Sequence, residues 1–181
     1  SCMRILLIGA SGIIGRAVLD LLAPTHEVVQ ASRAGTVRVD IADPESIRSM
    51  YQRVGTVDAV ICCAGTAVRK PLLVLSDADL QSSLANKLTG QVNVVRLGVD
   101  HVSDGGVFIL TSGVFSQRPT AGVPALALVN GALESFARAA ALDLPRGVRL
   151  NIVSPPFIKE SAAKMGLSMG LPTAENAKAY R

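Results

Sequence analysis

A glycine-rich segment near the N-terminus has the spacing of a phosphate-binding loop. It reads Gly9-Ala10-Ser11-Gly12-Ile13-Ile14-Gly15, and it lies between an apolar run and a segment of helical character. Gly9 can form a tight turn, Gly12 lets the backbone approach a pyrophosphate, and Gly15 lets a helix pack closely on a sheet. Amide groups at the start of that helix would face the phosphates. Because a strand and a helix are both expected around it, we interpret the segment as a dinucleotide site rather than a structural turn.

The end of the second expected strand indicates which dinucleotide would bind. An acidic residue here would bind a ribose 2′-hydroxyl group, but this chain has Ser32-Arg33. Arginine is a forked, permanently charged donor that suits a 2′-phosphate. The alternative is an ordinary surface arginine. Arg16 is either a helper at the phosphate or a residue of the helix surface. The sequence therefore predicts NADP as the cofactor.

Composition favours a globular domain and argues against several other classes. Hydrophobic residues make up 49% of the 181 residues and charged residues 18%, which argues against disorder. Aromatic residues make up only 3%, so a stacking surface for nucleic acid has little to build on. The net charge of +4 comes from scattered residues and predicts a solvated surface. We expect no nucleic-acid partner, no signal peptide and no stretch long and apolar enough to span a membrane.

The three cysteines predict neither a disulfide nor a metal site. Cys62 and Cys63 are adjacent in a strand-like segment, so their side chains should point to opposite faces, and Cys2 is distant in sequence. This usage favours a reducing, cytoplasmic compartment.

Hydrophobic periodicity then predicts the elements that carry these residues. Five helices are expected: Arg16 to Leu22, one opened by Asp43-Pro44-Glu45, a long one from about Asp77 to Val99, one carrying the apolar face from Leu126 to Ala140, and one that starts at Pro172-Thr173-Ala174-Glu175. Six strands are expected, at Arg4–Ile8, Glu27–Ala31, Thr36–Ile41, Val57–Cys63, Val107–Leu110 and Val148–Val153. This alternation predicts an α/β fold with a Rossmann-type, doubly wound parallel sheet in three α/β/α layers. With no linker or repeat, residues 3–181 are expected to form a single dinucleotide-binding domain.

With these elements placed, the sequence resembles the short-chain dehydrogenase/reductase family over most of its length. The resemblance rests on the glycine loop and on four further segments: Asp40-Ile41, Cys62-Cys63-Ala64-Gly65, Thr111-Ser112-Gly113, and the run from Arg146 to Pro155. The family contacts adenine at the first of these, and its catalytic serine lies at the position of Ser112. The resemblance implies a seven-stranded sheet, a homodimer or homotetramer, and cofactor contacts at Asp40, Ile41, Cys63, Ala64, Gly65, Pro155 and Ile158.

The chain departs from the family where a proton would be transferred. The register of Asn130-Gly131-Ala132-Leu133-Glu134 places Leu126 at the family's catalytic tyrosine and Asn130 at its lysine. The glycine loop is spaced G-x-x-G-x-x-G rather than the commoner G-x-x-x-G-x-G, and Pro155-Pro156 replaces Pro-Gly. The chain also ends before the family's last helix and strand, so we expect that strand to be lacking from it.

Ser112 and Lys87 remain as the expected catalytic residues. Ser112 can hold a carbonyl oxygen, and Lys87 lies three residues before Gly90, where the family often has an asparagine; Asn86 is the competing match. A lysine whose pKa is lowered by burial could act as acid or base, and a lysine extending to solvent is the alternative. Lys70 and Lys159 are expected to be surface residues. The sequence thus indicates an NADP-dependent oxidoreductase of atypical short-chain type acting on a small carbonyl or alcohol. The alternative is a non-catalytic NADP-binding sensor or carrier.

Overall fold

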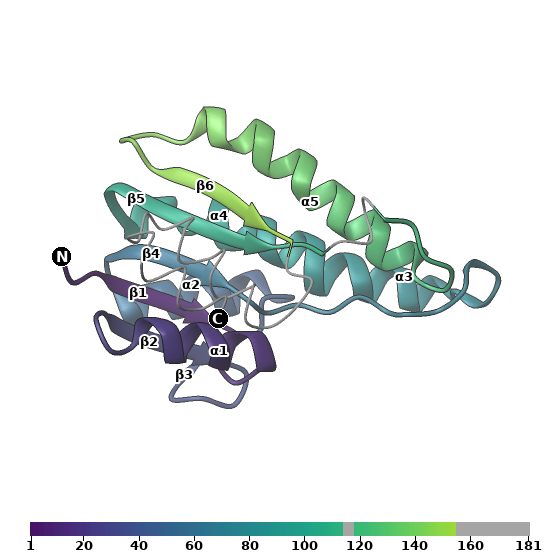
Figure 1. Cartoon of the computed structure of the whole chain (residues 1–181), viewed down its shortest axis with the longest axis horizontal. Coiled ribbons are helices and arrows are strands. Elements are labelled where there is room, and N and C mark those ends of the chain that lie inside the picture. The colour runs from purple at the N-terminus through teal and green to yellow at the C-terminus, as the bar shows by residue number, and fades with distance from the viewer. Residues whose placement is uncertain (114–117, 155–181) are drawn as a thin grey trace.

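In the part of the chain that the structure describes, six parallel strands form one sheet in the order β3-β2-β1-β4-β5-β6 (Figure 1). The fold is known from a computed structural model, which describes residues 1–113 and 118–154. The strands are β1 (Arg4–Ile8), β2 (Glu27–Ser32), β3 (Val37–Arg38), β4 (Val57–Cys62), β5 (Val102–Thr111) and β6 (Arg149–Val153). The strand order reverses between β1 and β4. A ligand of such a sheet binds at this switch point, beyond the carboxyl ends of the strands.

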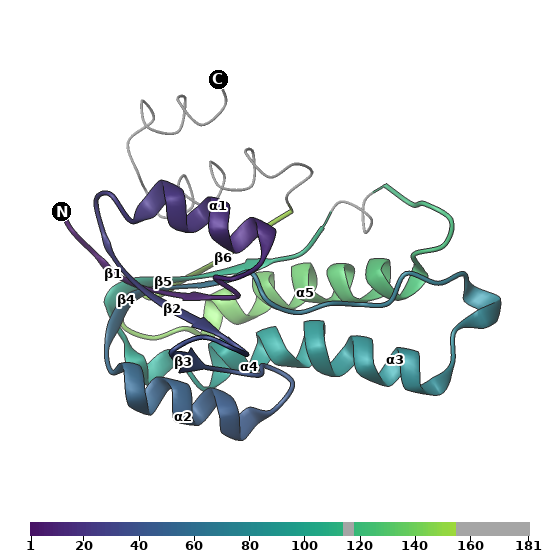
Figure 2. The same ribbon diagram turned by 90° about the horizontal axis from the view of Figure 1, so that it is seen from below.

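Helices cover both faces of the sheet and complete the predicted three layers. Figure 2 shows α1 on one face and α2, α4 and α5 on the other. Past the carboxyl ends of the strands, α3 extends beyond the sheet (Figure 1). The helical segments are α1 (Ile13–Leu22), α2 (Pro44–Val54), η1 (Leu72–Val74), α3 (Asp77–Ser83), η2 (Leu84–Thr89), α4 (Gly90–Arg96), η3 (Val99–His101) and α5 (Pro124–Asp143).

Two apolar clusters, one on each face of the sheet, hold these layers together. On β1, Leu6 and Ile8 face the cluster beneath α2, α4 and α5, whereas Ile5 and Leu7 face the cluster beneath α1. All four are fully buried, which explains why the strand is a continuous apolar run rather than an alternating one. Cys62 packs in the first cluster and Cys63 against the second, so the predicted opposite orientation is confirmed.

The predicted helix after β3 begins as the sequence indicated. Asp43 is the N-cap of α2, where its carboxylate accepts a hydrogen bond from the Glu45 amide at 3.0 Å, and Pro44 occupies the first turn. The cap satisfies one of the amides that the start of a helix leaves without a partner.

Several expected boundaries were wrong. The third strand has two residues, Val37–Arg38, rather than Thr36–Ile41, because the chain turns at Asp40, whose carboxylate accepts a hydrogen bond from the Ala42 amide. β5 starts at Val102, five residues earlier than predicted. The long predicted helix is α-helical at both ends, but its middle, η2, is a π-helix, and α4 ends at Arg96.

One expectation about membranes also needs correction. By length and composition alone, α5 is long and apolar enough to cross a membrane, although the sequence had suggested that no segment was. This is weak evidence, because a core helix of this composition passes the same test. The face of α5 that carries Val129, Leu133 and Ala137 packs in the larger apolar cluster.

Candidate functional site

The glycine loop joins β1 to α1 at the switch point of the sheet. Gly9 has a φ of +83°, which L side chains rarely adopt, and a Cβ there would lie 2.7 Å from the Ala64 backbone nitrogen. A Cβ at Gly15 would lie 2.0 Å from the Gly9 carbonyl oxygen. These two glycines therefore have the turn and packing roles expected of them. Among the described residues, a Cβ at Gly12 would have one neighbour within 4 Å, the Gly9 carbonyl oxygen at 3.6 Å.

The start of α1 has the features of an anion site. Gly12 is the N-cap, it provides no side-chain cap, and the first turn contains no acidic residue. Amides at a helix start that have no side-chain partner, together with the helix dipole, attract phosphate groups. Ser11 is exposed beside this turn, whereas the side chain of Ile14 packs against the apolar cluster beneath α1. Ile14 could therefore meet a ligand only through its backbone.

A cleft of about 250 Å³ extends from this loop along the carboxyl ends of the strands. It brings together ten of the predicted cofactor residues: Gly9, Ser11, Gly12, Ser32, Arg33, Asp40, Ile41, Cys63, Ala64 and Gly65. Val39, Thr66 and Asn86 line it as well, although the sequence reasoning did not assign them to the cofactor. Asn86 was considered only as the alternative to Lys87. The other two could have been found as neighbours of Asp40 and Gly65 in the chain.

Two arginines lie near the end of β2. Arg33 is exposed and lines the cleft. Arg16 lies on α1 and donates through Nε to the Ser11 carbonyl oxygen at 3.1 Å. Arg16 lines a neighbouring hollow that shares Ser11 and Ser32 with the cleft. The described residues that line the cleft include one acidic side chain, Asp40, which lies beyond β3 rather than at the end of β2.

These features fit a phosphorylated dinucleotide. The loop has no Cβ where a pyrophosphate would approach, the helix start is uncapped by side chains, and Arg33 lies where a 2′-phosphate would be recognised. No three His, Cys, Asp or Glu residues of the described chain lie close enough to hold a metal ion. Burial raises the pKa of both Cys62 and Cys63 to about 12, so neither thiol is activated as a nucleophile.

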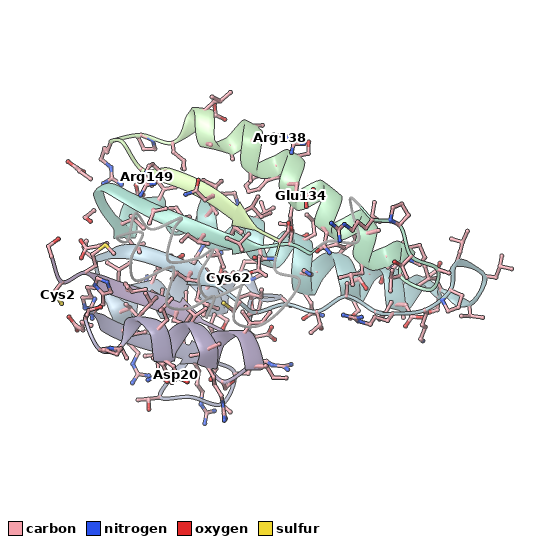
Figure 3. The ribbon with its side chains drawn as sticks, in the orientation of Figure 1. Cys2, Asp20, Cys62, Glu134, Arg138 and Arg149 are labelled. Carbon is pink, nitrogen blue, oxygen red and sulfur yellow. The ribbon has the colours of Figure 1, made fainter. Side chains whose placement is uncertain are left out.

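A compact hydrogen-bonded group lies at the carboxyl ends of β5 and β6. Thr111 pairs with Val153 in the ladder, so Ser112 and Ser154 are the next pair of residues. Their Oγ atoms are 2.6 Å apart. Glu134 of α5 approaches both, with Oε1 3.1 Å from Ser112 Oγ and 3.3 Å from Ser154 Oγ. We call Ser112, Ser154 and Glu134 the serine–glutamate cluster. Figure 3 labels Glu134 on α5.

Lys87 approaches the same strand end from η2. Its side chain is buried, and Nζ donates to the Ser112 carbonyl oxygen at 3.4 Å. Burial is the main reason that its pKa falls to about 8, and the positive charge of Arg69 lowers it further. Of the two possibilities raised by the sequence, the structure thus shows the buried lysine rather than one extending to solvent. Lys70 is a surface residue, as expected, and pairs with Asp79 at 2.9 Å.

Two further polar side chains fix the geometry around β5. Gln91 of α4 is fully buried, and it donates to the Thr111 carbonyl oxygen at 2.8 Å and accepts from the Thr111 amide at 3.0 Å. Thr111 Oγ1 donates to the Cys62 carbonyl oxygen at 2.7 Å. Thr111, the residue before Ser112, is therefore hydrogen-bonded both to α4 and to the neighbouring strand β4. Neither Gln91 nor Glu134 was recognised from the sequence, because their partners lie 20 and 22 residues away and depend on the sheet register.

Leu126 and Asn130 lie on the buried side of α5. Leu126 is 6% exposed and Asn130 is fully buried. A Cβ on Gly113 would lie 2.7 Å from Asn130 Nδ2, so this amide lies over the chain just after Ser112. Within the part of the chain that is described, neither polar atom of the Asn130 side chain has a hydrogen-bond partner. Pro155, Ile158, Lys159 and the helix expected from Pro172 lie outside the described residues.

Comparison with known proteins places the chain among oxidoreductases. A family model described as enoyl-(acyl carrier protein) reductase matches residues 14–178. The chain is 29% identical to L-xylulose reductase of Mesocricetus auratus over 91% of its length. It is 31% identical over 87% to a Mycobacterium tuberculosis protein named uncharacterized oxidoreductase MT0954. It spans 75% and 63% of the lengths of these two relatives.

Solved structures agree with this placement. The protein lin1944 of Listeria innocua has 41% identity and a TM-score of 0.85, covering 99% of this chain and 92% of that one. A small-chain dehydrogenase in complex with NADPH has 25% identity and a TM-score of 0.79, covering 86% and 70%. A short-chain dehydrogenase of Burkholderia cenocepacia in complex with NADP has 26% identity and a TM-score of 0.78, covering 84% and 73%. The fold, the glycine loop and the match over residues 14–178 together establish that the chain belongs to the short-chain dehydrogenase/reductase family.

Proposed function

We propose that this protein is an NADP-dependent oxidoreductase acting on a small carbonyl compound or alcohol. Family homologues are NAD(P)-dependent oxidoreductases, and two of the structural relatives were solved with NADP or NADPH. The observation that carries the proposal is the cleft itself. At one end of the cleft, α1 starts without a side-chain cap. Arg33 lines the cleft, and no acidic residue lies beside it at the end of β2. Three free cysteines are in keeping with the cytoplasmic location that we propose.

The residues at the end of β5 supply what such a reaction needs besides the cofactor. Bound NADP(H) would supply or accept a hydride at its nicotinamide ring. Ser112 would hold the reacting oxygen of the substrate, because its hydroxyl group lies at the carboxyl edge of the sheet. Lys87 is the candidate proton donor, since its pKa of about 8 keeps a transferable proton near neutral pH. A Lys87→Met variant that keeps full turnover would remove Lys87 from this role.

A sensor or carrier of NADP is the second candidate function. It is favoured by Leu126, which cannot donate a proton, and by Asn130, a neutral amide, at the positions assigned to the family's tyrosine and lysine. A nicotinamide absorbance assay with a wide panel of ketones and secondary alcohols separates the two functions. Tight NADP binding without turnover on the whole panel would favour the sensor.

Cofactor preference gives the first quantitative prediction. We expect binding of NADP(H) to be at least ~10-fold tighter than that of NAD(H), because one charged, bidentate phosphate contact contributes about 1.5–3 kcal/mol. Arg33→Asp should abolish or reverse the preference by replacing this contact with a repulsive charge. Isothermal titration calorimetry with both cofactors measures the ratio. Arg48→Asp on the outer face of α2, where Arg48 pairs with Glu45, is the matched control and should leave it unchanged. Equal affinities in the wild type would contradict the assignment of Arg33.

Assembly gives the second prediction. We propose a homodimer packed through α3, η2 and α4 on one side and α5 on the other, within the predicted spans Asp79–Val99 and Leu126–Leu142. Leu128 and Leu142 of α5 are 51% and 87% exposed, and Leu80 of α3 is 38% exposed. Apolar side chains of this size on two helices gain from burial in a two-fold interface. Light scattering at micromolar concentration should give twice the monomer mass. In Leu128→Glu the measured mass should fall toward that of the monomer. A monomeric wild type would refute the interface.

A further inference from the structure

The serine–glutamate cluster determines which hydrogen-bonding role Ser112 can play toward a ligand. Its three oxygen atoms lie 2.6, 3.1 and 3.3 Å from one another, so each pair is within hydrogen-bond distance. Only two hydroxyl protons serve these three contacts. A hydrogen bond to an ionised carboxylate is roughly twice as strong as one between neutral groups. The ionised Glu134 carboxylate therefore competes strongly for those protons.

Two arrangements of the protons satisfy the short contacts. In the first, Ser154 donates to Ser112 and Ser112 donates to Glu134, which uses the 2.6 and 3.1 Å contacts. In the second, Ser112 donates to Ser154 and Ser154 donates to Glu134, over 2.6 and 3.3 Å. Both consume the only proton of the Ser112 hydroxyl group inside the cluster. Any arrangement that frees this proton leaves an oxygen–oxygen contact of 3.1 Å or less without a hydrogen between the atoms.

From this geometry we infer that Ser112 accepts a hydrogen bond from the hydroxyl group of an alcohol substrate, and that Glu134 receives the proton through Ser112. The inference rests on the proposed oxidoreductase function and names its substrate class. Glu134 does not touch the substrate in this scheme. It is a positioning and relay residue that acts through Ser112, and it supplies a proton acceptor where the family's tyrosine is absent.

The reaction balances with the groups named. The C–H bond of the alcohol breaks, its hydride passes to the oxidised nicotinamide of NADP⁺, and the C–O bond becomes a carbonyl. The alcohol O–H proton moves to Ser112 Oγ while the proton of Ser112 moves to Glu134, which becomes a carboxylic acid. The same path in reverse protonates the oxygen during carbonyl reduction, so in this scheme the proton comes from Glu134 through Ser112 and not from Lys87, the donor considered above.

The charged groups around the cluster leave Glu134 as the proton acceptor. The basic side chains of the described neighbouring elements are Lys87 on η2, Arg138 on α5 and Arg149 on β6 (Figure 3 labels the two arginines). The other acidic residues, Asp104 on β5 and Asp143 on α5, are exposed near the far ends of their elements. Lys87 contacts the carbonyl oxygen of Ser112 and not its hydroxyl group. The effects of Glu134 and Lys87 can therefore be separated by mutation.

The kinetic test compares Glu134→Gln with Asp143→Asn, which makes the same change of acid to amide on the exposed end of the same helix. Alcohol oxidation is measured at neutral pH with NADP⁺ and a panel of secondary alcohols, and NADP⁺ binding is measured by calorimetry. We expect kcat/KM to fall at least about 100-fold in Glu134→Gln, with the affinity for NADP⁺ unchanged. Glu134→Asp should restore the rate in part, and Asp143→Asn should match the wild type. An unchanged kcat/KM in Glu134→Gln would show that the relay is wrong while leaving the oxidoreductase function intact.

Neutron diffraction from deuterated crystals of the wild type at neutral pH provides a readout that does not depend on turnover. We expect the deuterium on Ser112 Oγ to point toward Glu134 or Ser154. A deuterium that points out of the cluster would overturn the inference, whatever the activity. Deuterium inside the cluster together with no turnover on the whole panel would instead refute the proposed oxidoreductase function, and the proton relay with it.

Discussion

Giving the chain its family's catalytic set should raise turnover of simple secondary alcohols by about 10²–10⁴-fold, the range that general acid–base catalysis supplies. The changes are Leu126→Tyr and Asn130→Lys on α5, combined with Lys87→Asn on η2. The two residues on α5 are four apart and so project from the same helical face. If the proposed register is right, the tyrosine would act as the general acid, and the lysine would lower the pKa of that tyrosine. A nicotinamide absorbance assay measures the gain.

The third change is needed because of the local electrostatics. Lys87 Nζ lies at the Ser112 carbonyl oxygen, and Asn130 Nδ2 lies over Gly113, so a second lysine would enter a buried region that already contains one. Like charges in a buried site destabilise each other. We therefore expect the double change without Lys87→Asn to be less stable and less active than the triple change. A folded, NADP-binding triple variant that gains no activity would contradict the register that assigns Leu126 and Asn130 to the family's pair.

Replacing Lys87 with Met should stabilise the fold by about 3 kcal/mol at pH 7. The pKa of Lys87 falls from 10.5 to about 8 on folding, and one pKa unit corresponds to about 1.36 kcal/mol. Below pH 8 the lysine is charged in both states, and the folded protein carries the full cost of burying that charge. Between pH 8 and 10.5 the folded state releases the proton first, so the wild type gains stability as the pH rises.

Urea unfolding of the two proteins at pH 7 and pH 10 tests this. The difference should be largest at pH 7 and should fall to about a quarter of that value at pH 10, where the lysine of the unfolded chain is still mostly protonated. Cys62 and Cys63 act in the opposite direction above pH 9, because burial raises their pKa to about 12, but they are common to both proteins. Lys70→Met is the control. Lys70 forms an exposed pair with Asp79, and such pairs contribute at most about 1 kcal/mol. A Lys87→Met protein that is less stable than the wild type at pH 7 would show that the buried charge is compensated.

Much of the fold could be predicted because its signals are local. The apolar run of β1, the cap at Asp43 and the helical stripe on α5 each reflect neighbouring residues in the chain, and each element formed. The third strand was overestimated because Val37 to Ile41 alternates like a strand. Pairing with β2, however, ends at Arg38, where Ser32 is the last partner. The residue at which a strand ends depends on where its neighbour stops pairing with it. The sequence of the strand alone does not show this.

The cleft could largely be predicted from the sequence, whereas the contacts at the end of β5 could not. The turn at Gly9, the close packing at Gly15 and the position of Arg33 beside the cleft each follow from a strand, a turn and a helix in succession. Glu134 contacts Ser112 only because β5 and β6 pair with Thr111 opposite Val153 and α5 crosses above them. Such a contact arises from three elements distant in sequence. The burial of Lys87 likewise depends on how η2 packs against the end of β5.

The π-helical turn at Leu84–Thr89 contains both candidates, Asn86 and Lys87, that the sequence left for one position. A π-turn closes its hydrogen bonds over one residue more than an α-turn, so it accommodates a single additional residue without breaking the helix. Asn86 lines the cofactor cleft while Lys87 points to Ser112. Two consecutive residues of this turn thus face two different regions, the cleft and the end of β5. A change of one residue in chain length here would reassign which side chain meets the reaction centre. In a regular α-helix such as α5, the same change would rotate the whole buried face by about 100°.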